Sequence, residues 1–242
     1  TRDDEWGGSL GNRARLLLEC VRAARDAVGP DFPVAVKLNS ADFQQGGFSF
    51  DECLRVIEML NDEGIDLLEI SGGTYEQPRL LGIDGLEPVF AEKVRASTRA
   101  REAYFFDYAV HARAIAQMPL MITGGFRSAR GMNEALVNGD VDVIGLARPL
   151  LTDPGFPAGI LSGAVESAPD VEQGLRVGPG WLGPRSPIPL VKVINGFAKV
   201  GFWYEQIYRL ADGLDPDMSL SAFRALLAYD RTEKAKARAM AR

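Results

Sequence analysis

Short apolar runs alternate with segments of helical periodicity along the first 150 residues, and this order constrains the fold most strongly. The runs expected to be strands are 32–39, 65–71, 119–125 and 141–151. The segments expected to be helices are 12–29, 49–64, 101–117 and 128–140. Strands separated by helices of this length form βαβ crossovers, so the sequence predicts a parallel sheet.

The side chains of the first two strands favour a barrel over an open sheet. In 32–39, Val36 and Leu38 point to one face and Lys37 to the other; in 65–71, Glu69 is opposite in parity to Leu68. One face therefore suits packing under helices, while the other carries charges that need partners. A barrel interior provides such a place, although four strands cannot close the usual eight-stranded barrel.

Two of the strands end in small residues that suit a phosphate. Gly124 and Gly125 follow one apolar run and lead into a helix, and Ala147 and Arg148 follow the next. Glycine lets backbone N–H groups approach an anion, a helix N-terminus favours negative charge, and a guanidinium binds phosphate through two donors. We therefore expect a phosphate site at these strand ends.

Composition excludes several other functions. The net charge of −6 gives no reason to expect nucleic acid as a partner. The two cysteines, Cys20 and Cys53, lie in helical segments without metal-ligand spacing, so we expect two buried thiols in a reducing, cytoplasmic compartment, with no metal and no iron–sulfur cluster. No apolar run without a charge reaches transmembrane length, so no membrane partner is expected. The start at Thr1 suggests a piece of a longer protein.

Five stretches in order resemble the Old Yellow Enzyme family, the NADH:flavin oxidoreductases. They are DDEWGGSLGNRARLLLE, VAVKLNSADFQQGGFS, LLEISGGTYEQP, MITGGFRS and VDVIGLARPLLTDP. The resemblance implies a (β/α)8 TIM barrel of which this chain covers roughly the last four βα units, followed by a helical C-terminal tail. We accordingly expect residues 1–154 to form the C-terminal half of an FMN-binding barrel, and 155–242 a linker and helical extension.

The resemblance also implies cofactors and chemistry. NAD(P)H would reduce FMN, which would pass a hydride to an electron-poor alkene such as an α,β-unsaturated carbonyl. Gly124, Gly125, Ala147 and Arg148 match the family's phosphate-binding positions, and Lys37 matches a basic residue near the flavin N1 and O2 edge. A fixed cation there stabilises the negative charge of reduced flavin.

The chain departs from the family where the substrate should bind. The substrate-gripping histidines and the tyrosine proton donor belong to the absent first half of the barrel, so the catalytic residues are unknown and the chain alone is expected to be inactive. The single histidine, His111, lies within a helical segment and is interpreted as a packing or surface residue. Lys37 can also pair with Glu69, which does not exclude the flavin role, and Tyr75, in a long loop, is interpreted as a turn residue.

Two other functions remain open. One is a dihydroorotate-type dehydrogenase, which also uses a strand lysine and strand-end glycines, although the five ordered motifs argue against it. The other is a non-catalytic half-barrel that binds phosphate or flavin and assembles with itself or with another chain, since missing strands leave an open sheet edge. The aromatic helix expected at 190–210 packs on the barrel or on a second subunit, so a homo-oligomer is the candidate assembly.

Overall fold

The computed structural model describes residues 2–42, 46–71 and 106–240, and the side chains from residue 108 onward in the last stretch. These residues belong to two compact units, divided between Leu146 and Ala147. The predicted turn residue Tyr75 lies outside the described residues. Whether the barrel half ends at residue 154 stays a prediction, and the structure groups the residues from Ala147 onward with the C-terminal unit.

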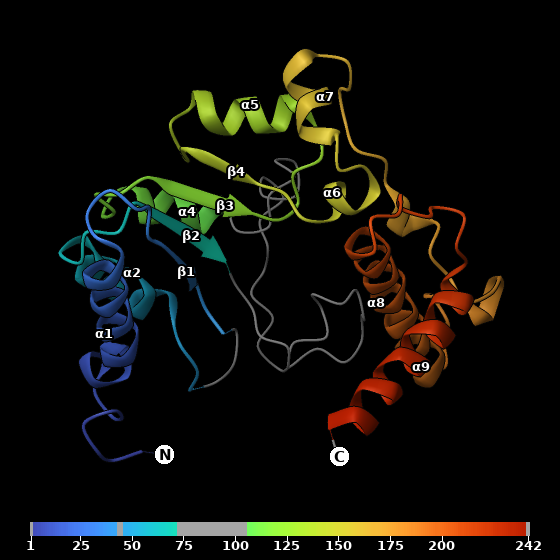
Figure 1. The fold of residues 1–242 in the computed structure, drawn as a ribbon, viewed down its shortest axis with the longest axis horizontal. Helices are drawn as coiled ribbons and strands as arrows, with labels where there is room; N and C mark the ends of the chain where they lie inside the picture. Colours follow the sequence, from blue (N-terminus) through green and yellow to red (C-terminus); the bar gives the residue numbers. More distant parts are fainter. Residues whose placement is uncertain (1, 43–45, 72–105, 241–242) are drawn as a thin grey trace. The chain divides into compact units, whose positions relative to one another are not determined.

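The first unit contains a parallel sheet in the order β1-β2-β3-β4 (Figure 1). Its elements are α1 (Leu10–Val28), β1 (Ala35–Asn39), α2 (Phe50–Asn61), β2 (Leu67–Ser71), α4 (Phe106–Arg113), β3 (Leu120–Thr123), α5 (Ala129–Val137) and β4 (Val143–Gly145). Each strand pairs with the next one along the chain, as successive βα units require. The predicted alternation and the parallel sheet are therefore confirmed.

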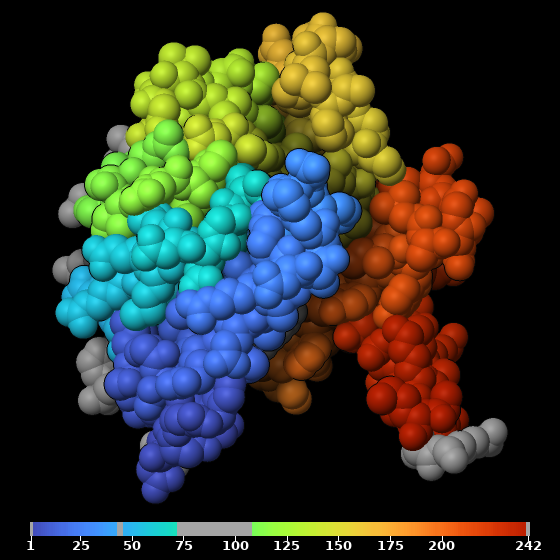
Figure 2. All heavy atoms as spheres, turned by 60° about the vertical axis from the view of Figure 1, so that its left-hand side comes forward, coloured from blue at the N-terminus to red at the C-terminus, as the bar shows by residue number. Residues whose placement is uncertain are grey.

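The two faces of the sheet differ in the way the residue parity predicts. Leu38, Ile70 and Ile122 lie on one face and are buried. Leu38 and Ile70 belong to a core shared with Val21 of α1 and Ile57 of α2. The outer surface of these helices runs from α1 in blue through α2 in cyan to α5 in yellow-green in Figure 2. Burying this aliphatic face under helices is the main stabilising contribution in the unit.

Local signals in the sequence fix where α2 begins and ends. Ser49 accepts a hydrogen bond from the backbone N–H of Glu52, and the Glu52 side chain accepts one from the backbone N–H of Ser49. This capping box, predicted from the sequence, satisfies two N–H groups that the helix leaves free. Gly64 then adopts a φ of 64°, which turns the chain toward β2.

Aspartates placed one residue before β2 and β4 hold the register of each strand pair. Asp66 accepts a hydrogen bond from the backbone N–H of Val34 at 2.7 Å and forms an ion pair with Arg25 of α1. Asp142 repeats the arrangement: it accepts from the N–H of Leu120 at 2.8 Å and pairs with Arg113 of α4 at 2.7 Å. Each aspartate thus binds the amino end of the neighbouring strand and the helix that precedes that strand.

Three sequence-based expectations for this unit are corrected by the structure. The run 141–151 is a strand only over Val143–Gly145, because Pro149 cannot donate to a ladder and instead lies in the first turn of α6 (Arg148–Thr152). The helix expected to reach Gln117 ends at Arg113, because the Asn61 side chain hydrogen-bonds to the backbone of Ile115 and Gln117. Of the two thiols expected to be buried, Cys53 is buried and Cys20 is exposed on α1.

The described part of the second unit, from Ala147 to Met240, is helical. It contains α6, α7 (Phe156–Ser162), the 3-10 turns η2 (Val171–Gln173) and η3 (Gly180–Leu182), α8 (Pro189–Ala211) and α9 (Ala222–Met240). The two long helices lie side by side (Figure 1). A Cβ at Gly201 of α8 would lie 3.1 Å from the Ala225 carbonyl oxygen of α9, so the small residue permits this close approach. Phe202 fills the core beside them.

Two buried amides connect the irregular segments of this unit to α8. The Asn195 side chain accepts from the backbone N–H of Val177 and donates to the Leu182 carbonyl, both at 2.9 Å. The Gln206 side chain accepts from the N–H of Asp217 at 2.7 Å. These bonds satisfy backbone groups that loops would otherwise leave unpaired. Across the described ranges, no helix combines the length and the apolar character needed to cross a membrane.

Candidate functional site

The chain leaves β3 through two glycines in left-handed backbone conformations. Gly124 has a φ of 115° and Gly125 a φ of 91°. Side-chain-bearing residues rarely adopt such values, so both positions need glycine. Ser128 then caps α5, accepting from the backbone N–H of Gly131 at 3.1 Å. A glycine turn leading into a helix can present backbone N–H groups to an anion, so the predicted phosphate site at this strand end stays a prediction.

The end of the neighbouring strand, β4, also requires a glycine. Thr123 of β3 pairs in register with Gly145 of β4. A Cβ built at Gly145 would lie 1.8 Å from the Thr123 Oγ1 atom, so the threonine hydroxyl occupies the space that a side chain at 145 would need. Glycine at 145 therefore allows the hydroxyl to be held beside the carboxyl end of the sheet.

Buried polar atoms without partners gather at the ends of β1 and β3. The Thr123 Oγ1, Asn39 Oδ1 and Ser40 Oγ atoms are buried and have no hydrogen-bond partner within the described part of the chain. Asn39 uses its amide group instead, donating to Asp42 Oδ1 at 2.6 Å. Buried polar atoms are nearly always satisfied in native proteins, so these three indicate where a polar ligand or further chain would supply the missing partners.

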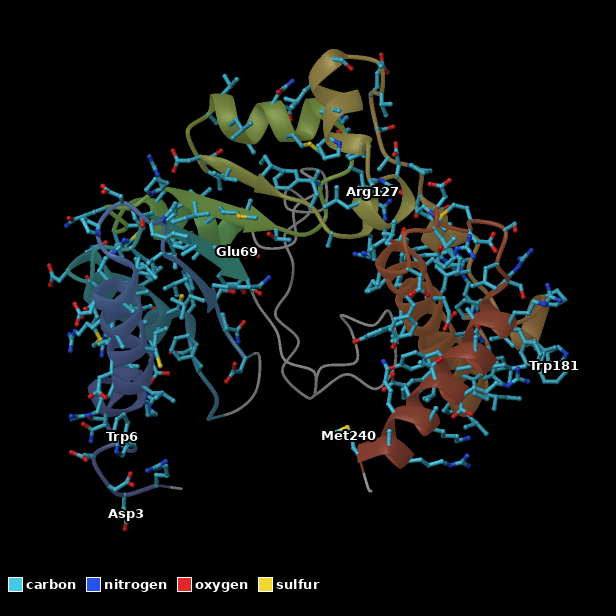
Figure 3. The ribbon with its side chains drawn as sticks, in the orientation of Figure 1. Asp3, Trp6, Glu69, Arg127, Trp181 and Met240 are labelled. Carbon is cyan, nitrogen blue, oxygen red and sulfur yellow. The ribbon has the colours of Figure 1, made fainter. Side chains whose placement is uncertain are left out.

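Lys37 lies on the face of the sheet that points away from the helices. Its Nζ atom is 2.7 Å from the Glu69 Oε1 atom of the adjacent strand, and the two residues are directly paired in register. Figure 3 labels Glu69 on β2. The Lys37 side chain remains 57% exposed, whereas that of Glu69 is 18% exposed. The predicted ion pair is thus present, and enough of the ammonium group stays accessible to meet a ligand.

Ala147 and Arg148 belong to the second unit, so only their contacts within that unit are described. Ala147 precedes α6 without a side-chain cap, and Arg148 is the first residue of that helix. The Arg148 Nη1 atom is 2.6 Å from the Glu172 Oε1 atom, and the Arg148 side chain is 39% exposed. A guanidinium has five N–H donors, so this single bond leaves others free for a phosphate.

His111 has the packing role that the sequence suggested. It lies on α4 with its ring edge-on to Phe50 of α2, the ring centroids being 5.9 Å apart. Among the described residues, no group of three or more histidine, cysteine, aspartate or glutamate side chains is arranged to hold a metal ion.

Sequence reasoning missed three features of the site. Glu172 is the partner of Arg148 from 24 residues away, and nothing in the local pattern indicates it. Thr123 and Ser40 each end or follow a strand with an unpaired hydroxyl, a feature that depends on burial rather than on spacing. A polar residue at the end of an apolar run is the only signal that could have suggested them.

A parallel βα sheet with glycines and polar groups at its carboxyl edge is the architecture of α/β proteins, many of which bind ligands at their strand ends. Residues 1–166 match the model of the NADH:flavin oxidoreductase / NADH oxidase family. The chain belongs to this family, which includes the Old Yellow Enzymes.

Individual relatives agree with the family assignment. The chain is 36% identical over 176 residues to the NADH-dependent flavin oxidoreductase iliE of Neonectria sp. (strain DH2), covering 72% of this chain and 23% of that protein. It is 29% identical over 180 residues to the NADPH dehydrogenase of Geobacillus sp. (strain WCH70), covering 74% of this chain and 46% of that protein. The chain therefore spans less than half the length of the relatives it matches.

Solved structures show the same likeness. A 2-naphthoyl-CoA reductase in complex with 2-naphthoyl-CoA has a TM-score of 0.58 and 27% identity, covering 69% of this chain and 24% of that one. The histamine dehydrogenase from Rhizobium sp. 4-9 has a TM-score of 0.52 and 29% identity, covering 67% of this chain and 21% of that one.

Proposed function

We propose that this chain is the C-terminal part of an FMN-dependent oxidoreductase in which NAD(P)H reduces the flavin and the flavin delivers hydride to an electron-poor alkene, such as an α,β-unsaturated carbonyl. The family match supports the flavin and the nicotinamide reductant. The alkene substrate is the finer part of the proposal. In this proposal the four described strands are the last four of a (β/α)8 barrel, and the remaining strands would continue the sheet beyond β1 and β4.

One observation carries the proposal: unpaired polar groups and left-handed glycines occur together at the carboxyl edge of the sheet. FMN combines a phosphate with a ring that accepts and donates hydrogen bonds. The backbone of Gly124 and Gly125 suits the phosphate, and the free Thr123 hydroxyl suits a polar group of the ligand. The residues present therefore fit the cofactor, which would supply the hydride-transfer chemistry when bound.

Lys37 would stabilise the negative charge of the reduced flavin. Its ammonium group, on the face of the sheet, would attract the negative charge that a reduced flavin carries at its N1 and O2 edge. Glu69 holds the lysine in place at 2.7 Å and at the same time moderates its field. The lysine therefore orients and stabilises charge without exchanging a proton in the reaction.

The family resemblance is the ground for proposing that Arg148 and Ala147 also bind the phosphate. The Arg148 guanidinium keeps donors free beyond its bond to Glu172, and alanine at 147 leaves the backbone there open to a close contact. Glu172 fixes the guanidinium before the phosphate arrives, which lowers the entropy lost on binding.

The chain by itself is proposed to be inactive in alkene reduction. The residues that grip a substrate carbonyl and donate a proton are expected outside this part of the barrel. The second candidate function, a non-catalytic half-barrel that binds phosphate or flavin and assembles with another chain, is favoured by the exposed face carrying Lys37.

The test is flavin retention by the purified chain. FMN is added, the excess is removed by gel filtration, and the visible absorption spectrum is recorded for the wild type, for Arg148→Ala and for Arg224→Ala, an exposed arginine of α9. The proposal expects retained flavin that is lost in Arg148→Ala and kept in Arg224→Ala. Equal retention in the two variants would reject the phosphate role of Arg148.

A second readout separates the two candidate functions. NADH and cyclohexenone are added to the flavin-loaded chain and to a version extended by the N-terminal half of a family barrel. Enone reduction only by the extended version supports the enzyme fragment. Flavin binding with no reduction in either version supports the non-catalytic alternative.

A further inference from the structure

The second unit contains a cavity between the η2 turn and the start of α9. Its volume is about 430 Å³, which lies within the range of about 300–1,000 Å³ found for small-molecule sites. Residues of η2 and of the chain around it form one wall, and residues 218–222 form the other. None of the described lining residues belongs to the proposed flavin site, so the cavity is a separate feature of the unit.

The floor of the cavity is apolar and belongs to the core of the unit. Leu175 and Ala222 line it and are only 6% and 3% exposed. Val171 and Leu220 also line it and pack against the same core. Met218, which is 38% exposed, extends the apolar surface toward solvent. A concave apolar surface of this kind suits an apolar group of a ligand.

The rim of the cavity carries one charge of each sign. Asp170 and Arg176 both line the cavity and are exposed. The Gln173 Nε2 atom donates to the Asp170 Oδ2 atom at 2.6 Å, which holds the carboxylate in place. The Arg176 guanidinium makes no hydrogen bond or ion pair with the described residues. It is therefore available to a carboxylate, which a guanidinium binds through two parallel hydrogen bonds.

Gly174 keeps the cavity open. Its backbone has a φ of −81° and a ψ of −20°, which any residue can adopt, so the conformation does not require glycine. A Cβ built at this position would meet only the Val171 carbonyl oxygen, at an ordinary contact distance of 3.4 Å. Packing therefore does not require glycine either. A larger side chain at 174 would instead occupy the cavity that this residue lines.

Both walls are fixed by hydrogen bonds of the unit itself. In the η2 wall, the backbone N–H of Gly174 donates to the Val171 carbonyl at 3.0 Å. Beside the other wall, the backbone N–H of Asp217 donates to the Gln206 side chain of α8 at 2.7 Å, and the Asp217 carboxylate accepts from the N–H of Ser219 at 2.9 Å. Walls that are formed in advance reduce the entropy lost when a ligand binds.

We infer that this cavity binds a free α-amino acid with a large apolar side chain. The carboxylate of the ligand pairs with Arg176, its ammonium group pairs with Asp170, and its side chain lies on the apolar floor. An α-amino acid carries all three groups on one carbon atom. A ligand with only the carboxylate would bring a negative charge to the rim without a partner for Asp170, and an amine would leave Arg176 unpaired.

Isothermal titration calorimetry of the purified chain with L-phenylalanine tests the inference. The charged contacts lie at the surface, so we expect weak but saturable binding, with a dissociation constant of about 0.1–1 mM. Two analogues each remove one charge: 3-phenylpropionate lacks the ammonium group, and phenethylamine lacks the carboxylate. Each should bind at least about fivefold more weakly than L-phenylalanine, because one charged contact is lost.

Two variants and a control locate the binding. Gly174→Leu fills the cavity and should abolish binding of L-phenylalanine, and Arg176→Met should weaken it at least about fivefold. Arg185→Met changes an exposed arginine of the same unit outside the cavity lining and should leave binding unchanged. Thermal unfolding followed by circular dichroism should show that no variant melts below the wild type. If Gly174→Leu does melt lower, Arg176→Met decides the location of the site.

Three results would overturn the inference. An absence of saturable binding would show that the cavity does not hold an amino acid. An analogue that binds as tightly as L-phenylalanine would show that the charge it lacks makes no contact with the rim. Binding that is unchanged in both Gly174→Leu and Arg176→Met would occur at another place on the chain. None of these results bears on the flavin proposal, which the retention of FMN tests separately.

Discussion

Lys37 and Glu69 face each other across β1 and β2, with 2.7 Å between the lysine Nζ and the glutamate Oε1 atoms. The pair combines a fixed cation with the carboxylate that positions it, on the face of the sheet opposite the helices. In the proposed flavin site the lysine would raise the reduction potential of the cofactor and the glutamate would lower it. Measuring both effects distinguishes an electrostatic role from a purely structural one.

The midpoint potential of bound FMN should respond in opposite directions to loss of either partner. Lys37→Met removes a cation that stabilises reduced flavin, so the potential should fall by roughly 30–60 mV. Glu69→Gln removes the opposing negative charge, so the potential should rise. Spectroelectrochemical titration measures both, with Lys234→Met on α9 as a control that should change nothing. A shift of the same sign in both variants would show that they only perturb the packing.

Gly145 should not tolerate a methyl group. Gly145→Ala would bring a Cβ to 1.8 Å from Thr123 Oγ1, so the variant should lose about 1–3 kcal/mol of unfolding free energy. Urea denaturation followed by circular dichroism gives the value. Thr123→Ala in the same chain should restore part of it by removing the clashing hydroxyl. Gly11→Ala on α1, where nothing lies within 4 Å of the new Cβ, is the control and should not destabilise.

The contacts of the Asp66 carboxylate should make the stability of the folded chain depend on pH. The backbone N–H of Val34, and then the Arg25 guanidinium, hold the pKa of the Asp66 carboxyl below its usual value. A depressed folded-state pKa contributes stability above the unfolded-state value of about 3.9, and this stability is lost as the pH falls through the folded-state pKa. Asp66→Asn should therefore melt at a lower temperature than the wild type at pH 7.

The difference between these two melting temperatures should shrink below about pH 4, where the wild-type carboxyl becomes protonated as well. Differential scanning calorimetry from neutral to acid pH follows it. A constant difference at all pH values would mean that Asp66 acts only through its shape.

The two thiols should differ sharply in reactivity. Burial raises the pKa of Cys53 to about 12, so its reactive thiolate is scarce near neutral pH, whereas Cys20 is exposed on α1. Titration of the native chain with a disulfide reagent at pH 8 should release one equivalent of chromophore, and the unfolded chain should release two. Two rapid equivalents from the native chain would contradict the buried position of Cys53.

The sequence predicted those features that depend on neighbouring residues. The alternation of strands and helices, the capping box of Ser49 and Glu52, and the two faces of β1 each follow from spacing within a few positions. The pairing of Lys37 with Glu69 followed because residue parity in adjacent parallel strands places both side chains on one face.

Features that depend on distant residues were not predictable. The Arg148–Glu172 and Arg25–Asp66 pairs join residues 24 and 41 positions apart, and only the folded chain brings them together. The exposure of Cys20 depends on which side of α1 meets the sheet. The end of β4 at Gly145 was a local error, and Pro149 held the information needed to avoid it.

The relative affinities of the chain for FMN and riboflavin test the central claim most directly, because the two ligands differ only by the phosphate. Titrations monitored by flavin fluorescence should show FMN binding at least about tenfold more tightly than riboflavin, since charge-assisted bonds to phosphate are lost in riboflavin. Arg148→Ala should remove most of that preference. Equal affinities for the two ligands in the wild type would contradict a phosphate site at these strand ends.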